Sequence, residues 1–107
     1  MADQASRAGA SFTVLVVFTV GPGKASDLVA KVQNLMEGVL TSEPGFVSAA
    51  AYKSEDDGEV VTVTTWRERR DFEAFRQKPN VLAGMMGGLE YQPKIHFLRE
   101  IARLSAR

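Results

Sequence analysis

EPGFVSAAAYKSEDDGEVVTVTTW, residues 43–66, carries the clearest structural signals of this chain. Pro44-Gly45 blocks the continuation of a helix, and two runs rich in small, β-branched and aromatic residues follow it. The acidic link between the runs ends in Asp57-Gly58, a dipeptide typical of tight hairpin turns. The pattern therefore predicts two antiparallel strands, Phe46–Lys53 and Glu59–Trp66, the second of which ends on the only tryptophan.

A strand and a helix are predicted before this hairpin. The run Phe12–Val20 is rich in valine and phenylalanine, as strands are, and Gly21-Pro22-Gly23 ends it. A helix follows over Lys24–Leu40, because its apolar residues recur at steps of three and four and form one stripe. The stripe consists of Leu28, Val32, Leu35, Met36 and Val39.

A second helical region and a last strand are predicted after the hairpin. The region begins near Arg69 and is interrupted at Lys78-Pro79, since the residue before proline disfavours helical geometry. A second segment runs over residues 81–86 to Gly87-Gly88, and Ile95–Ile101 is the fourth strand. The order βαββαβ predicts an α+β fold, a ferredoxin-like sandwich with both helices on one face of the sheet.

Length and composition exclude several classes of function. The chain has 107 residues, which suit a single domain, expected over residues 11–104 after a disordered tail at 1–10. Lysine and arginine together number 13, as do aspartate and glutamate, so no net charge attracts nucleic acid or an anionic membrane. There is no cysteine and one histidine, which argues against disulfides, thiolate catalysis and a metal site. The apolar run 12–20 is too short to span a membrane, and the expected location is the cytoplasm.

The predicted sheet has two apolar faces. Alternation along the first strand places Val14, Val16 and Phe18 on one face and Leu15 and Val17 on the other. Two helices can cover one face only, and the other would be a larger apolar patch than soluble monomers usually expose. We therefore expect a homodimer in which two sheets pack face to face.

Four segments of this chain form a recognisable set: Pro-Gly-Lys at 22–24, Glu-Pro-Gly-Phe-Val-Ser-Ala at 43–49, Val-Val-Thr-Val-Thr-Thr-Trp at 60–66 and Asp-Phe-Glu-Ala-Phe at 71–75. Together they resemble the antibiotic biosynthesis monooxygenase family. The resemblance implies a dimeric α+β barrel with a pocket between sheet and helices in each subunit. It also implies oxygenation of polycyclic aromatic polyketides or related quinones and phenols in antibiotic biosynthesis, without cofactor or metal.

The resemblance further implies a polar set in the pocket, of which this chain keeps the tryptophan, Trp66. The other three positions, usually an asparagine, an aromatic hydroxyl and a basic residue, are occupied by Thr62, Phe72 and Met85. The haem-degrading branch of the superfamily needs a histidine on its second helix, and residues 69–86 contain none.

Candidate site residues follow from side-chain chemistry. His96 is the only side chain whose unperturbed pKa lies near neutrality, so it is a candidate proton acceptor. Trp66 could stack on a planar ligand or fill the core, and Thr62 could hold a water; these three are the candidate catalytic residues. The candidate substrate-binding residues are Tyr52, Ser48, Thr64, Phe72, Phe75, Leu82, Met85 and Met86.

Three functions remain open at this stage. The first is the cofactor-free monooxygenase. The second is a polyketide cyclase, which would use the same apolar pocket and one proton-transfer group without oxygen. The third is a non-catalytic dimer that binds the ligand.

Overall fold

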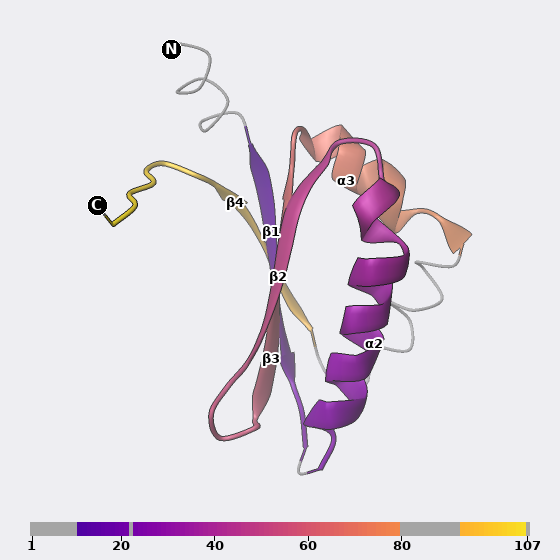
Figure 1. Cartoon of the computed structure of the whole chain (residues 1–107), viewed down its shortest axis with the longest axis vertical. Coiled ribbons are helices and arrows are strands. Elements are labelled where there is room, and N and C mark those ends of the chain that lie inside the picture. The colour runs from indigo at the N-terminus through magenta and orange to yellow at the C-terminus, as the bar shows by residue number, and fades with distance from the viewer. Residues whose placement is uncertain (1–10, 22, 80–92, 107) are drawn as a thin grey trace.

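The computed structural model of the chain describes residues 11–21, 23–79 and 93–106. Its elements are β1 Phe12–Thr19, α2 Ala25–Gly38, the 3-10 helix η1 Leu40–Ser42, β2 Phe46–Lys53, β3 Glu59–Trp66, α3 Arg69–Arg76 and β4 Lys94–Arg99 (Figure 1). The four strands form one antiparallel sheet in the order β2-β3-β1-β4. The predicted ferredoxin-like fold is confirmed.

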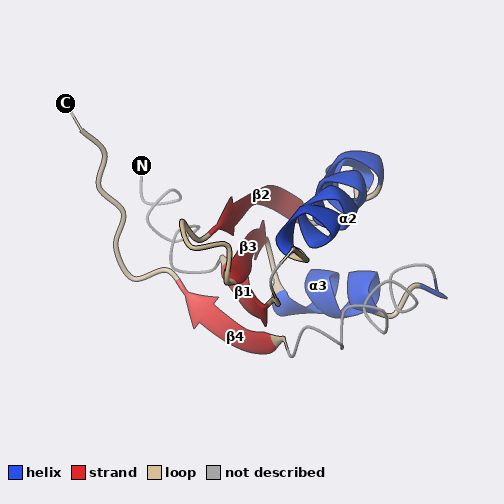
Figure 2. Cartoon of the chain, turned by 90° about the horizontal axis from the view of Figure 1, so that it is seen from below, coloured by secondary structure: helices blue, strands red, loops and turns tan. Residues whose placement is uncertain are grey.

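Both helices lie on the same side of the sheet, as Figure 2 shows. We call this side of the sheet the helix face and the opposite side the outer face. The register assigns each strand residue to a face, because Trp66 and Val60 on β3 are buried under the helices and side chains alternate along a strand. All candidate site residues on strands can therefore be placed.

The predicted elements agree with the observed ones apart from their ends. Both strands of the hairpin have the predicted bounds. The first helix ends at Gly38, two residues early, and a 3-10 turn replaces its last residues. The last strand ends two residues early, at Arg99, which pairs with Phe12, the first residue of β1. The predicted segment 81–86 lies outside the described residues.

The core on the helix face consists of two apolar clusters. One surrounds Trp66 and includes Val14, Leu40, Phe72 and Phe75. The other lies towards the opposite end of the sheet and contains Val20, Ala25, Leu28 and Val60. The residues paired across the sheet between the two clusters are Ala51, Thr62, Val16 and Ile95. None of these four residues is fully buried, whereas both clusters contain buried residues.

A β-bulge near the start of β2 changes which of its side chains share a face. Phe46 pairs with Trp66, but the next paired residue is Ser48, opposite Thr65. A bulge adds one residue to the strand and so changes which side chains share a face. Phe46 therefore lies on the helix face, whereas Tyr52, which uninterrupted alternation would place beside it, lies on the outer face.

No secondary-structure element of the described chain covers the outer face of the sheet (Figure 2). Its central residues are apolar: Leu15 and Val17 on β1 lie between Val63 and Val61 on β3 and the last strand, β4. None of these four side chains is fully buried. Leu98 on the same face is 42% exposed.

Candidate functional site

Trp66 is the centre of the aromatic end of the helix face. Its side chain is fully buried, and its ring centroid lies 5.7 Å from that of Phe46, 5.9 Å from Phe72 and 5.2 Å from Phe75. The indole N–H donates a hydrogen bond of 3.0 Å to the hydroxyl of Thr64, so its polar group is satisfied. In this structure Trp66 is a core residue with no ring face open to a ligand. Of the two interpretations of Trp66, the geometry favours the packed core.

The start of α3 is held in place by a reciprocal cap. Glu68 is the N-cap residue, and its backbone N–H donates to the carboxylate of Asp71 at 3.2 Å, which completes a capping box. The same carboxylate lies against Gly45, whose φ of +79° suits glycine. The Pro-Gly turn before β2 and the first turn of α3 thus meet, and this contact sets the position of Phe72 and Phe75 over the sheet.

Thr62 lies at the centre of the helix face. It pairs with Ala51 on one side and Val16 on the other, and its side chain is half-buried. Within the described part of the chain its hydroxyl makes no hydrogen bond to another residue, whereas that of Thr64 is engaged by Trp66. Of the two candidate threonines on the helix face, Thr62 is therefore the one whose hydroxyl is not committed to another described residue.

Three other candidates lie on the outer face. His96 pairs with Leu15, Tyr52 with Val61 and Ser48 with Thr65, and all three are exposed. Within one chain the sheet separates them from Thr62 and Trp66. The three candidate catalytic residues consequently do not meet in a single subunit. The candidates Leu82, Met85 and Met86 lie outside the described residues.

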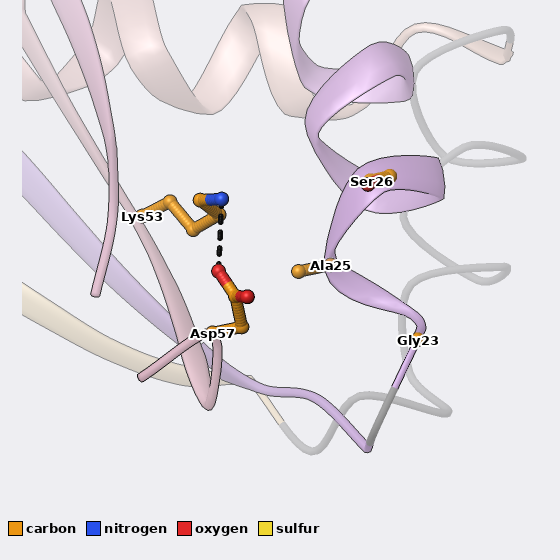
Figure 3. Close-up of a pocket in the computed structure, with 5 residues that line it drawn as sticks. All are labelled: Gly23, Ala25, Ser26, Lys53 and Asp57. Carbon is orange, nitrogen blue, oxygen red and sulfur yellow. Dashed lines mark ion pairs between the residues drawn. The ribbon is translucent and has the colours of Figure 1, made fainter. Parts of the chain in front are cut away.

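A groove runs between the first half of α2 and β2. Its volume is about 330 Å³, and its apolar lining includes Val29, Val32, Ala51 and Val60. From β2 the groove is lined by Ala51, Tyr52 and Lys53. Lys53 lies at one end of the groove and also borders a hollow of about 60 Å³, where its ammonium group pairs with Asp57 at 2.8 Å (Figure 3). The hollow has room for a few water molecules only.

Arg69 lies over the aromatic end of the helix face and is not among the candidate residues to which the sequence pointed. Its guanidinium carbon lies 4.7 Å from the ring centroid of Phe97 on β4 and 5.5 Å from that of Phe12 on β1. The spacing of Arg69, Phe72 and Arg76 on one side of α3 was the available signal, because residues three and four apart lie on the same helix face.

The described residues thus form a small α+β sandwich with an aromatic helix face and an outer face that no described element covers. The chain belongs to the antibiotic biosynthesis monooxygenase family, which it matches over residues 11–86. It is 32% identical over 92 residues to tetracenomycin-F1 monooxygenase of Streptomyces glaucescens, a match that covers 86% of this chain and 73% of that protein.

Two solved structures share the fold. The first is SnoaB, a cofactor-independent oxygenase from Streptomyces nogalater, with a TM-score of 0.80 and 17% identity over 91% of this chain and 99% of that one. The second is Rv0793 from Mycobacterium tuberculosis, with a TM-score of 0.77 and 23% identity over 89% of this chain and 99% of that one. Among residues 11–21, 23–79 and 93–106, no group of three potential ligands could hold a metal ion, and no helix could cross a membrane.

Proposed function

We propose that this protein is a monooxygenase of antibiotic biosynthesis that oxygenates an electron-rich polycyclic phenol or anthrone of the aromatic polyketide type. The observation that carries the proposal is the 32% identity to tetracenomycin-F1 monooxygenase, which extends over 86% of the chain. The aromatic end of the helix face supports it, because ligands with fused rings gain contact energy from aromatic side chains.

The proposed reaction needs no external reductant. The substrate loses a proton, and its anion transfers electrons to molecular oxygen. A C–O bond forms at the ring carbon, the O–O bond breaks, and a CH₂ group becomes a carbonyl while the second oxygen atom leaves as water. Both electron pairs come from the substrate, which is why the proposal includes no flavin, haem or metal.

The helix face would bind and orient the substrate in this scheme. Phe72 and Phe75 are buried against Trp66 and would fix α3 beside the ligand. The half-exposed side chains of Phe97 and Ile95 on β4 would contact its flat rings. Thr62 would hold a water near the reacting carbon, and the apolar surroundings would exclude bulk solvent. Met85, Met86 and Leu82 remain predicted lining residues. His96 lies on the outer face, so we assign the proton transfer to the Thr62 side of the sheet.

Oxygen consumption tests the proposal. Purified protein mixed with an anthrone should consume oxygen faster than the anthrone alone and yield the corresponding quinone. Uptake at the uncatalysed rate would overturn the monooxygenase assignment. Turnover of a polyketide substrate that continues under nitrogen would support the cyclase instead, and tight binding without any product would support a non-catalytic binding dimer.

We also propose that two copies of the chain associate through their outer faces. Leu15, Val17, Val61 and Val63 form a continuous apolar surface, which a second sheet would cover. The symmetry of such a pair would place the same surface on both partners. Leu98 and Tyr52, 42% and 60% exposed in the single chain, lie on the same face.

A further inference from the structure

The guanidinium group of Arg69 is held over aromatic rings rather than extended into solvent. It lies 4.7 Å from the centroid of Phe97 and 5.5 Å from that of Phe12, and the two ring centroids are themselves 5.5 Å apart. Arginine stacks on aromatic rings through its planar, weakly hydrated cation, and this contact leaves its N–H donors in the plane free to bind an anion.

The hydrogen-bond donors of Arg69 are largely uncommitted. Among the described residues its one ion-pair partner is Glu73, whose carboxylate lies 3.5 Å from Nε, at the limit of a hydrogen bond. Its side chain is 58% exposed, so this pair contributes little. Arg70 differs, because its guanidinium pairs with Glu68 at 2.9 Å and its side chain is 80% exposed.

An open apolar surface lies beside this cation. Phe97 and Ile95 are on the helix face of β4, and each is 42% exposed. Ile95 pairs with Val16, which in turn pairs with Thr62. A flat ligand on this surface would therefore extend from the row of Thr62 to the aromatic rings beneath Arg69, with one edge next to the guanidinium.

We propose that Arg69 binds the ionised hydroxyl of a flat phenolic ligand on the helix face and so selects the phenolate over the neutral phenol. The inference rests on the proposed function and deepens it, since the anion is the form that gives electrons to oxygen. The other charged groups near this surface are Glu73 and Arg76 on α3 and Arg99 on β4, which pairs with Phe12. The residues of β1, all described, include no titratable side chain.

The pKa of a bound ligand tests the assignment without any turnover. A hydroxyanthraquinone changes its visible absorption on ionisation, so its pKa can be measured free and in the presence of excess protein. A cation within reach of the phenolate should lower that pKa by about one unit. Arg69→Gln should remove most of the shift, Arg69→Lys should keep part of it, and Arg67→Gln should keep all of it.

Arg67→Gln is the matched control because it removes the same charge from an exposed side chain two residues away. Circular dichroism of Arg69→Gln should match that of the unmodified protein, since the cap of α3 uses Glu68 and Asp71 only. Binding with an unshifted pKa, or an equal shift in Arg69→Gln, overturns the role of Arg69 and leaves the proposed function standing. No binding of the ligand by the unmodified protein overturns both.

Discussion

Gly45 occupies a position where neither its backbone conformation nor its surroundings tolerate a side chain. Its φ of +79° lies in the left-handed region, and a Cβ atom there would overlap the carboxylate of Asp71. That carboxylate caps α3, so a substitution would disturb the helix that carries Phe72 and Phe75.

Gly45→Ala should destabilise the fold by about 2 kcal/mol or more, because it combines a left-handed alanine with a displaced helix cap. Gly23→Ala is the control, since Gly23 has a φ of +77° and nothing within 4 Å of its added Cβ. The control should cost about 1 kcal/mol from its backbone conformation alone. Urea denaturation measures both, and equal losses would show that the contact with Asp71 is unimportant.

Thr62→Val should lower turnover while it preserves the fold. The two side chains are close in shape, and the hydroxyl of Thr62 bonds to no other described residue. If that hydroxyl positions a water for proton transfer, its loss should reduce the rate by about tenfold or more. Thr65→Val, on the outer face, is the control and should keep the rate. An unchanged rate in Thr62→Val would remove Thr62 from the mechanism.

His96→Gln should leave the turnover rate within about twofold of that of the unmodified protein. Loss of a general base would instead lower the rate by about 10²–10⁴-fold. The reason is geometric, because His96 pairs with Leu15 and lies on the outer face. Steady-state kinetics on the same substrate give the answer. A loss of two orders of magnitude would mean that catalysis involves the outer face after all.

The faces of single residues were predictable only where the strand is regular. Trp66 and Thr62 share the helix face as alternation along β3 requires. Uninterrupted alternation from Phe46 would place Ser48 and Tyr52 on the helix face, but the bulge between Phe46 and Ser48, which has no clear signature in the sequence, moves both to the outer face. Arg69 was missed because a cation–π contact joins α3 to β4, two elements whose approach the sequence does not specify.

At the scale of elements, the hairpin between β2 and β3 is closed by side chains as well as by its backbone. Ser54 donates to Asp56 at 2.7 Å, and its hydroxyl oxygen accepts the backbone N–H groups of Gly58 and Glu59. Asp56 also accepts the N–H of Gly58, at 2.9 Å. The Ser54 hydroxyl and then the Gly58 amide lower the pKa of the Asp56 carboxyl below its ordinary value of 3.8.

Because the pKa of Asp56 is lowered in the folded protein, the stability of the fold should depend on pH. The ionised Asp56 is favoured in the folded hairpin, so its stabilising contribution is present above pH 3.8 and is lost as the pH falls towards the lower folded value. Asp56→Asn should therefore be less stable than the unmodified protein at pH 6, and the difference should shrink as the pH falls below 4. Thermal unfolding at several pH values measures it, and a difference that does not depend on pH would contradict it.

Element identities were predictable because their patterns are long and periodic, whereas their ends depend on partners. β4 ends at Arg99, opposite Phe12, where β1 begins. Beyond that point Glu100 and Arg103 pair with each other, and Ile101 is 96% exposed. No local property of Ile101 distinguishes it from a strand residue.

At the scale of the molecule, the sheet has two apolar faces, and the described helices cover only one of them. Leu15→Lys would place a charge in the middle of the proposed interface between two outer faces. We expect the protein to sediment as a dimer at micromolar concentration and this variant to sediment as a monomer. Asn34→Lys, which adds the same charge on the exposed side of α2, should remain dimeric. A monomeric unmodified protein would overturn the proposed association.

The position of the single tryptophan provides separate optical signals for two processes. Trp66 is enclosed by Phe46, Phe72 and Phe75 on the helix face, so its fluorescence should be blue-shifted and should move to the red only when α3 leaves the sheet. Separation of two outer faces would not change the surroundings of the indole. Emission wavelength therefore follows unfolding, while fluorescence anisotropy, which depends on tumbling, follows dissociation in the same sample.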